Sequence, residues 1–350
     1  NRNYFSAILT SCLMWYGLLA MTACTEQAEY TIAQSDIPIY FSVSMNVLTE
    51  HPVSRTTATS FEPQDQIGLF ATLPPATLNS QRYIDNLLLT TTDGKNFSPE
   101  QIVYYPTGDA SLNFTAYHPY QANGLSAESS ILPVSIQADQ SSSENFSKSD
   151  FLWAQKNGVS SSSEAVQLNF THKFSKLKIA LVPEEEEVLS ALADEQPRIV
   201  VTGIKTEANC NLEDGTLSDL QTPSDIIPYG TWSVEENKLV GKELIFIPQA
   251  LNSQEHSIII EWKGRIYVYL MPEVELQGAE QCEITIEFRQ EENEQLSGIA
   301  GSITDWTDAE NGGNSNEQNN SVIYTSSLSF ASSGVYQIYY QGRAIAEICK

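Results

Sequence analysis

Positive charge is scarce in this sequence, and the scarcity limits which partners the chain can bind. Its 350 residues hold 18 Lys and Arg against 44 Asp and Glu, which gives a formal net charge of −26. No cluster of basic residues offsets this charge locally, so nucleic acid and anionic lipid head groups would be repelled. We therefore expect no nucleic-acid partner.

The patterns of common catalytic and metal sites are also missing. The histidines, His51, His118, His172 and His256, have no second type of ligand at metal-binding spacing. The chain has no phosphate-binding loop, zinc-protease motif or nucleophile elbow. Acidic residues are so numerous that no pair of them stands out as catalytic. The sequence predicts that the protein is not an enzyme and uses no cofactor and no metal.

Cysteine is rare, with five residues and no Cys-x-x-Cys spacing. Cys12 and Cys24 lie near the N-terminus, which leaves Cys210, Cys282 and Cys349 for the body of the chain. These three cannot all pair with one another. Isolated thiols and a Cys210–Cys282 disulfide are both compatible with the sequence.

The long apolar run of the chain lies at its N-terminus. Arg2 precedes an apolar stretch from Tyr4 to Ala20, and "MTAC" follows it, a pattern typical of a secretory signal peptide. Its end resembles a bacterial lipobox, in which small residues precede a cysteine that becomes diacylated. We predict residues 1–23 to be a signal peptide and Cys24 to be the lipidated mature N-terminus. Plain secretion or a membrane anchor is the alternative.

Helical periodicity is scarce, whereas alternation of apolar and polar residues recurs along the chain. One stretch, Pro183 to Pro197, predicts a short surface helix. The run "SIIIEWKGRIYVYLMP" predicts a hairpin that turns at Lys263–Gly264. A shift of phase near Lys173–Lys176 predicts a bulge or a sharp bend. Short strands with many turns favour β-sandwiches.

The most regular alternation precedes an isolated basic residue. It predicts one strand with six apolar residues on one face: Ile37, Ile39, Phe41, Val43, Met45 and Val47. Arg55 follows, and it is the only Lys or Arg between Cys24 and Gln81. Its neighbours in "HPVSRTT" are compatible with a flexible, exposed link.

Two polar stretches divide the remainder of the chain. The Ser-rich segment Lys156–Val166 predicts a domain boundary, and Glu310–Asn320 separates a tail from the second set of strands. The tail has two alternating runs, within Val322–Phe330 and Val335–Ile348. The apolar and aromatic residues that share one face are Val322, Tyr324, Leu328 and Phe330 in the first run and Tyr336, Ile338 and Tyr340 in the second.

Several short motifs, taken in order, resemble the fimbrillin (Mfa-like) family of bacterial surface-pilus subunits. They follow the lipobox cysteine and are "SRTTATSFEPQDQIGLFA" from Ser54, "VYYP" at Val103–Pro106, "LNFTAYHPY" at Leu112–Tyr120, "DFLWA" at Asp150–Ala154, "VQLNFTHKFSKLKIAL" at Val166–Leu181, "LIFIPQAL" at Leu244–Leu251 and "GSITDW" at Gly301–Trp306. His118 stands where the family often has Tyr. Each motif is short, and their order and spacing over Cys24–Trp306 carry the resemblance.

The resemblance implies an all-β fold with two tandem transthyretin-like β-sandwich domains. We place them at residues 56–160 and 161–310, after a lipidated segment at 24–55 and before a linker and tail at 311–350. It also implies a lipoprotein of the outer membrane and cell surface, held to the membrane only by the acyl chains, such as palmitate, on Cys24. Other fimbrial subunits are the implied partners, in a homo- or heteropolymer.

Assembly in the family follows the removal of an N-terminal strand and its replacement by a strand of a neighbouring subunit. Here a cut between Arg55 and Thr56 would release the strand Ile37–Val47, and the tail would supply the donor strand. The alternatives are that Arg55 is an ordinary surface residue and that the tail completes its own sheet. A different function is that of a monomeric surface lipoprotein that binds glycans, and host proteins or glycans are further candidate partners.

Overall fold

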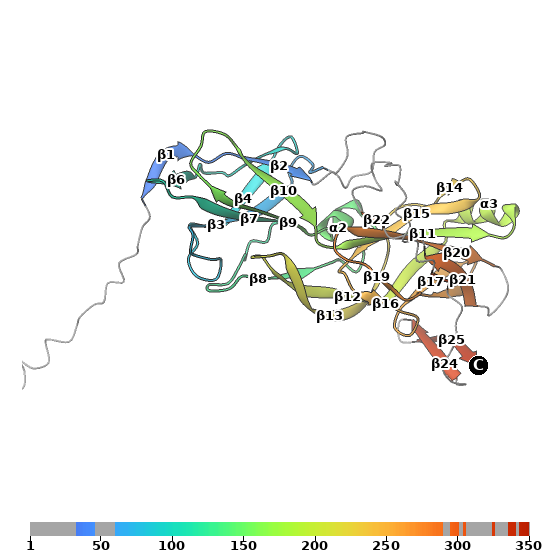
Figure 1. Cartoon of the computed structure of the whole chain (residues 1–350). Helices are drawn as coiled ribbons and strands as arrows, with labels where there is room; N and C mark the ends of the chain where they lie inside the picture. The colour runs from blue at the N-terminus through green and yellow to red at the C-terminus, as the bar shows by residue number, and fades with distance from the viewer. Residues whose placement is uncertain are drawn as a thin grey trace, which may run out of the picture. The chain divides into compact units, whose positions relative to one another are not determined.

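The computed structural model describes residues 33–45, 60–289, 295–300, 304–305, 324–325, 335–340 and 343–349. Within these ranges the chain forms a closed barrel, a twelve-stranded sheet and three two-stranded sheets (Figure 1). The predicted all-β fold class is confirmed. In this part of the chain no helix is long and apolar enough to cross a membrane.

The first sheet closes on itself as a seven-stranded barrel. Its spatial order is β10-β2-β5-β4-β3-β7-β9. The strands are β2 (Phe41–Met45), β3 (Gln66–Thr72), β4 (Ile84–Thr91), β5 (Asn96–Ser98), β7 (Leu112–His118), β9 (Leu152–Val159) and β10 (Val166–His172). β2 and β10 run parallel, and the other neighbours run antiparallel. Alternating apolar residues, among them Leu69, Phe114 and Leu168, point inward and fill a common core.

The second sheet has the order β13-β12-β17-β18-β21-β20-β11-β15-β14, with β8, β22 and β23 paired to β12, β20 and β21. Its strands are β8 (Ile131–Ser135), β11 (Ser175–Pro183), β12 (Arg198–Asn211), β13 (Thr216–Ile226), β14 (Ser233–Glu235), β15 (Lys238–Phe246), β17 (Ser257–Trp262), β18 (Arg265–Leu270), β20 (Glu280–Phe288), β21 (Gln295–Ala300), β22 (Thr304–Asp305) and β23 (Tyr324–Thr325). Ile226 near one end of this order and Leu239 near the other belong to the same buried core. The sheet therefore wraps around its core, and its two halves face each other as sandwich layers do.

Short elements complete the described fold. The two-stranded sheets are β1 (Gln34–Pro38) with β6 (Tyr104–Pro106), β16 (Ala250–Leu251) with β19 (Val274–Glu275), and β24 (Val335–Tyr340) with β25 (Arg343–Cys349). Helix α2 (Ser143–Lys148) begins after Ser142, whose hydroxyl accepts a hydrogen bond from the backbone N–H of Asn145. Helix α3 (Glu186–Glu195) lies within the stretch predicted to be helical and buries one apolar face.

Two local predictions are confirmed, and the structure shows the physical reason for each. β17 and β18 form the expected hairpin, in which Trp262 pairs with Arg265. The two turn residues Lys263 and Gly264 both have positive φ, of 50° and 72°, as a two-residue type I′ turn requires. The phase shift near residue 173 is a sharp bend, because β10 ends at His172 and β11 begins at Ser175 in the other sheet.

The Ser-rich stretch predicted as a domain boundary connects two barrel strands. β10 follows this stretch, yet it pairs with β9 and β2 of the barrel. β8 precedes the stretch and pairs with β12 of the second sheet. The change of sheet thus falls at residues 173–174, and the division of the chain into domains stays a prediction.

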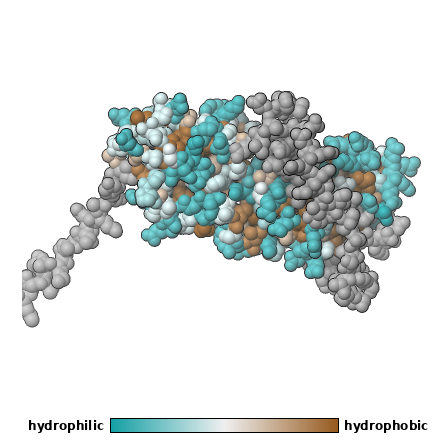
Figure 2. All heavy atoms as spheres, in the orientation of Figure 1, coloured by the Kyte–Doolittle hydropathy of each residue, from teal (hydrophilic) through white to brown (hydrophobic). Residues whose placement is uncertain are grey.

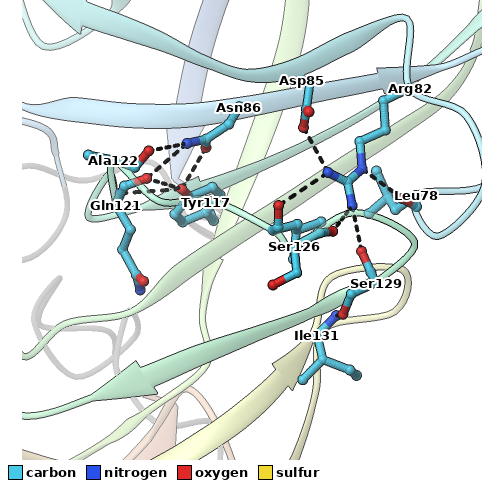
Figure 3. A network of polar contacts seen from close by, with 11 residues as sticks. Leu78, Arg82, Asp85, Asn86, Tyr117, Gln121, Ala122, Ser126, Ser129 and Ile131 are labelled. Atoms are coloured by element: carbon cyan, nitrogen blue, oxygen red, sulfur yellow. Dashed lines mark hydrogen bonds and ion pairs between the residues drawn. The ribbon is translucent and has the colours of Figure 1, made fainter.

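An arginine secures the loop between β7 and β8 (Figure 3). The Arg82 side chain, only 8% exposed, donates to the carbonyls of Leu78, Ser126 and Ser129 at 2.7 Å each and pairs with Asp85 at 2.8 Å. These charge-assisted bonds tie two separate turns of chain, one at Leu78 and one at Ser126–Ser129, to one planar guanidinium. The loop is therefore fixed before it enters β8.

Cys210 and Cys282 are buried thiols, so the disulfide considered between them does not form. Burial raises the pKa of the Cys210 thiol to about 12. A thiol with so high a pKa is a poor nucleophile at neutral pH. Cys210 therefore serves as a small apolar core residue.

Candidate assembly site

The candidate exchangeable strand β2 lies between two strands that come from distant parts of the chain. Five of its residues pair in parallel register with β10, from Phe41 opposite Val166 to Met45 opposite Phe170. On its other side only Phe41 and Ser42 pair with β5. The Val43 N–H adds one bond to the carbonyl of Lys95, at 2.8 Å. β2 thus closes the barrel, through a long ladder on one side and a short one on the other.

The inward face of β2 is apolar and buried. Phe41 is 2% exposed, and its ring meets that of Phe114 edge to face at 5.7 Å between centroids. Val43 and the preceding Ile39 are buried in the same core. Burial of side chains of this size contributes roughly 1.5–3 kcal/mol each. This face is the main source of affinity between the strand and the barrel.

The outward face of β2 carries two serine hydroxyls that match two amides on β10. Ser42 donates to Gln167 Oε1 at 2.9 Å, and Ser44 donates to Asn169 Oδ1 at 2.8 Å. Both pairs are directly opposite each other in the parallel register. They add a polar ladder that defines the register, because a slip by one residue would break both bonds and turn the apolar face outward.

The expected single strand from Ile37 to Val47 is divided in the structure. β1 ends at Pro38, which has no N–H to continue a ladder, and β2 begins at Phe41. Ile39 bonds to the carbonyl of Val103, whereas the Tyr40 carbonyl accepts from Val166 N–H. Ile37 is 38% exposed, so it does not share the buried face of Phe41 and Val43. Val47 lies outside the described residues.

The described chain resumes after the Arg55 region with a residue anchored in the barrel. Phe61 is buried and contacts the rings of Phe97, Phe170 and His118 at 5.2–5.3 Å between centroids. Gly94, with φ of 72°, lies directly under the Phe61 carbonyl, where an added Cβ would come within 2.1 Å of the oxygen. The new N-terminus produced by a cut after Arg55 would therefore begin a few residues before a fixed aromatic anchor.

The turn before β5 is held by one carboxylate. Asp93 accepts hydrogen bonds from the backbone N–H groups of Lys95 and Asn96 at 2.8 and 2.7 Å. Bonds from the backbone N–H of Asn96, then of Lys95, hold the pKa of the Asp93 carboxyl well below its usual range. These bonds lie within the turn itself, and none of them involves β2.

The tail residues lie in two different settings. Tyr324, in β23, pairs with Ala300 of β21, so this part of the tail extends the sheet of its own chain. Tyr336, Ile338 and Tyr340 lie in β24, which pairs with β25 as a hairpin. Val322, Leu328 and Phe330 lie outside the described residues, as do Cys24, Arg55 and Thr56. Among the described residues, Ile37 of β1 and the residues of β2 therefore lie in other sheets than Tyr324 of β23 and the residues of β24.

The chemistry of this site is hydrogen bonding and apolar burial. β2 has no charged residue. Among the described residues, no group of three or more His, Cys, Asp or Glu could hold a metal ion. What the site can do is bind or release an extended strand, because a sheet edge offers N–H and C=O groups beside an apolar groove.

Sequence reasoning missed the strand that β2 pairs with most extensively. Gln167 and Asn169 of β10 lie 125 residues from their serine partners, and nothing in either stretch points to the other. The alternation of polar and apolar residues in "VQLNF" was the available signal. It identified a strand and left its partner open.

The comparisons with known proteins agree with this architecture. The family model described as fimbrillin-like matches residues 54–306. Candidate cell adhesion proteins from Bacteroides uniformis and Bacteroides ovatus share the fold, with TM-scores of 0.56 and 0.60 and sequence identities of 17% and 18%. The alignments cover 77% and 78% of this chain and 98% of each of theirs.

The fimbrial anchor protein Mfa2 from Porphyromonas gingivalis also matches, with a TM-score of 0.38 and 9% identity over 77% of this chain and 98% of that one. No curated protein matches the sequence. The family model spans most of the chain and includes the strands of both sheets from β3 to β22. The chain therefore belongs to the fimbrillin-like family.

Proposed function

We propose that this protein is a non-enzymatic structural or adhesive subunit of a cell-surface fimbria. It is exported as a lipoprotein through Cys24 and assembles by strand exchange with other fimbrial subunits, of its own or another kind. It is held to the outer membrane by the lipid alone. The chain then comprises a lipidated segment, two β-domains with the predicted boundaries, and a tail.

One observation carries the assembly mechanism. β2 closes the barrel with a buried apolar face and lies upstream of the single basic residue of its region. A cut between Arg55 and Thr56 leaves β2 held by non-covalent contacts only. Its departure exposes an apolar groove between β10 and β5 with unpaired backbone groups on both sides, which a strand of a neighbouring subunit would satisfy.

The test is to treat the unlipidated chain of residues 25–350 with a protease that cuts after Arg, and to follow its mass in mild detergent. We expect a ladder of high-mass species from the cut chain. The Arg55→Gln variant is the matched control and should stay monomeric. Equal ladders from both chains would contradict the role of Arg55.

The tail is tested by two truncations. A chain that ends at Gly334 keeps β23 and lacks the β24–β25 hairpin, whereas one that ends at Asn320 lacks both. If β24 donates, the chain ending at Gly334 stays folded and fails to polymerise after the cut. If the tail only completes its own sheet, the chain ending at Asn320 unfolds or aggregates, and normal ladders from the chain ending at Gly334 would exclude β24 as donor.

A further inference from the structure

A groove of about 600 Å³ lies where the loop after β7 faces β8, β12 and β13. Its lining includes three buried apolar residues, Val134, Ala208 and Phe151, beside polar ones. Apolar side chains reach the surface among polar ones over β8 and β12 (Figure 2). A groove of this size that is lined by both apolar and polar groups has the dimensions of a small-ligand site.

The polar rim is built by strand register. Ser135 of β8 lies opposite Glu207 of β12, and Glu207 lies opposite Gln221 of β13. The three exposed side chains therefore form a row across three adjacent strands. Asn209 and Gln137 continue the polar lining. Amide side chains offer both donors and acceptors, as the hydroxyl groups of a sugar require.

The charge of the lining is balanced. Lys148 and Glu207 are its only ionisable cation and anion, and Lys148 is paired with Glu144 at 2.6 Å. The chain as a whole has a formal charge of −26. An anionic ligand would be repelled by the molecule and would meet no net positive charge in the groove. The groove therefore suits a neutral ligand.

One wall of the groove is held in place before any ligand arrives (Figure 3). The Gln121 carbonyl accepts from Asn86 Nδ2 at 2.9 Å and from the Tyr117 hydroxyl at 3.1 Å. Tyr117 is fully buried, and burial raises the pKa of its hydroxyl to about 12, so it stays a neutral donor. Tyr120, next to Gln121, also lines the groove. A fixed wall lowers the entropic cost of binding.

The edge of β8 beside the groove is closed to an added strand. Leu212 donates to Ser130, and Ile136 donates to Thr206, so the even-numbered residues bond to β12 and the odd-numbered ones face the other way. Pro133 on that edge has no N–H, and its carbonyl accepts from Gln121 Nε2 at 3.0 Å. Proline and an occupied carbonyl both block pairing with a peptide strand.

We propose that this groove binds a neutral oligosaccharide, with a sugar ring on Tyr120 and hydroxyl groups on the amides of Gln137, Asn209 and Gln221. The site does not depend on β2 or on the tail. The inference goes beyond the proposed subunit role, and it holds or fails independently of fibre assembly.

The experiment uses the Arg55→Gln chain of residues 25–350, which is expected to remain monomeric. It is applied to an array of neutral oligosaccharides of glucose, galactose, mannose and N-acetylhexosamines, with sialylated and sulfated counterparts. We expect at least one neutral oligosaccharide to bind, and its Kd is then measured by calorimetry.

Matched variants locate the site. Tyr120→Ala should weaken binding about fivefold to tenfold through the lost ring contact, and Gln221→Ala, on an exposed strand position, about fivefold. Tyr40→Ala removes a tyrosine that is 52% exposed and outside the groove, and it should leave the Kd unchanged. Circular dichroism confirms that each variant is folded.

Three results would overturn the proposal. The first is an array on which only anionic glycans, or none, bind. The second is a neutral ligand whose Kd is the same in the folded Tyr120→Ala and Gln221→Ala variants as in the parent chain. The third is binding of a synthetic peptide of residues 321–350 that both substitutions abolish, because the groove would then be a strand-docking site.

Discussion

The barrel and the twelve-stranded sheet are built around strands of very different kinds. In the sheet, β11 pairs over eight residues with β20, from Lys176 to Pro183, and along most of its length with β15. In the barrel, β2 pairs over five residues with β10 and over two with β5. The barrel is thus closed by one short strand that precedes Arg55, whereas the twelve-stranded sheet is open and holds the long strand β11 in its interior.

This difference indicates where a strand can leave without unfolding the whole molecule. Removing β11 would interrupt the chain and two long ladders. Removing β2 after a cut near Arg55 interrupts neither β10 nor β5, which remain anchored by β9, by β4 and by the turn at Asp93. The barrel is therefore where the proposed strand exchange would take place.

The largest expected effect is that of the Phe41→Ala substitution on the stability of the barrel. Loss of this buried ring should destabilise the barrel by about 3–5 kcal/mol, because it removes apolar contacts and leaves a cavity. Hydrogen exchange measured by mass spectrometry should accelerate in β5 and β10 and stay unchanged in β11 and β20. The matched variant Phe288→Ala, which removes a buried ring of the second sheet, should do the reverse.

If hydrogen exchange in the Phe41→Ala variant accelerated equally in both sheets, the barrel could not be said to lose β2 independently of the twelve-stranded sheet. It would mean that the barrel and the sheet unfold as one cooperative unit, so that β2 could not leave alone.

The comparison also shows which features of the fold a sequence can predict. The hairpin at Lys263–Gly264 was predictable because the turn and both strands are adjacent in the chain. Helix α3 was predictable for the same reason. The division of the first strand was missed, although Pro38 was visible, because its cause is a pair of bonds to Val103 and Val166. Alternation is a local signal and does not identify distant partners.

The assembly site and the groove also differ in how far the sequence predicts them. The apolar face of β2 was readable from Phe41 and Val43, so the assembly site could be proposed from the sequence. The groove could not be predicted from the sequence, because its lining comes from a loop, a helix and three strands spread from Pro119 to Gln221. Its residues are ordinary amides and prolines that form a site only once the strands are in register.

A smaller effect is expected at Gln140, a buried glutamine that bonds to the second sheet. Its side chain donates to the carbonyl of Ile245 at 2.7 Å and accepts from the N–H of the same residue at 2.9 Å. Gln140→Ala leaves both backbone groups without these bonds, at a cost of about 1–3 kcal/mol. Urea unfolding should show this loss, whereas the exposed Gln254→Ala should stay within about 0.5 kcal/mol of the parent.

If Gln140→Ala made hydrogen exchange faster in the barrel and not around Ile245, this result would contradict the separate stability of the barrel and the twelve-stranded sheet. It would mean that the 137–150 segment unfolds with the barrel, although the Gln140 side chain bonds to β15.

The smallest expected effect concerns the outer ladder of β2. The double variant Ser42→Ala and Ser44→Ala removes two hydroxyls whose acceptors, Gln167 and Asn169, remain accessible to water. The buried face with Phe41 is untouched, so the stability of the uncut chain should fall by only about 1 kcal/mol in total. After the cut at Arg55, however, β2 is held by non-covalent contacts alone, and the same loss should raise its dissociation rate about fivefold.

A fluorescent peptide of residues 35–47 added in excess reports this rate as it replaces the bound strand. Ser218→Ala, at an exposed hydroxyl on β13, is the control and should leave the rate unchanged. An exchange rate that is the same in the double variant and its parent would show that the apolar face alone holds β2, and that the serine–amide ladder does not contribute to the affinity between the strand and the barrel.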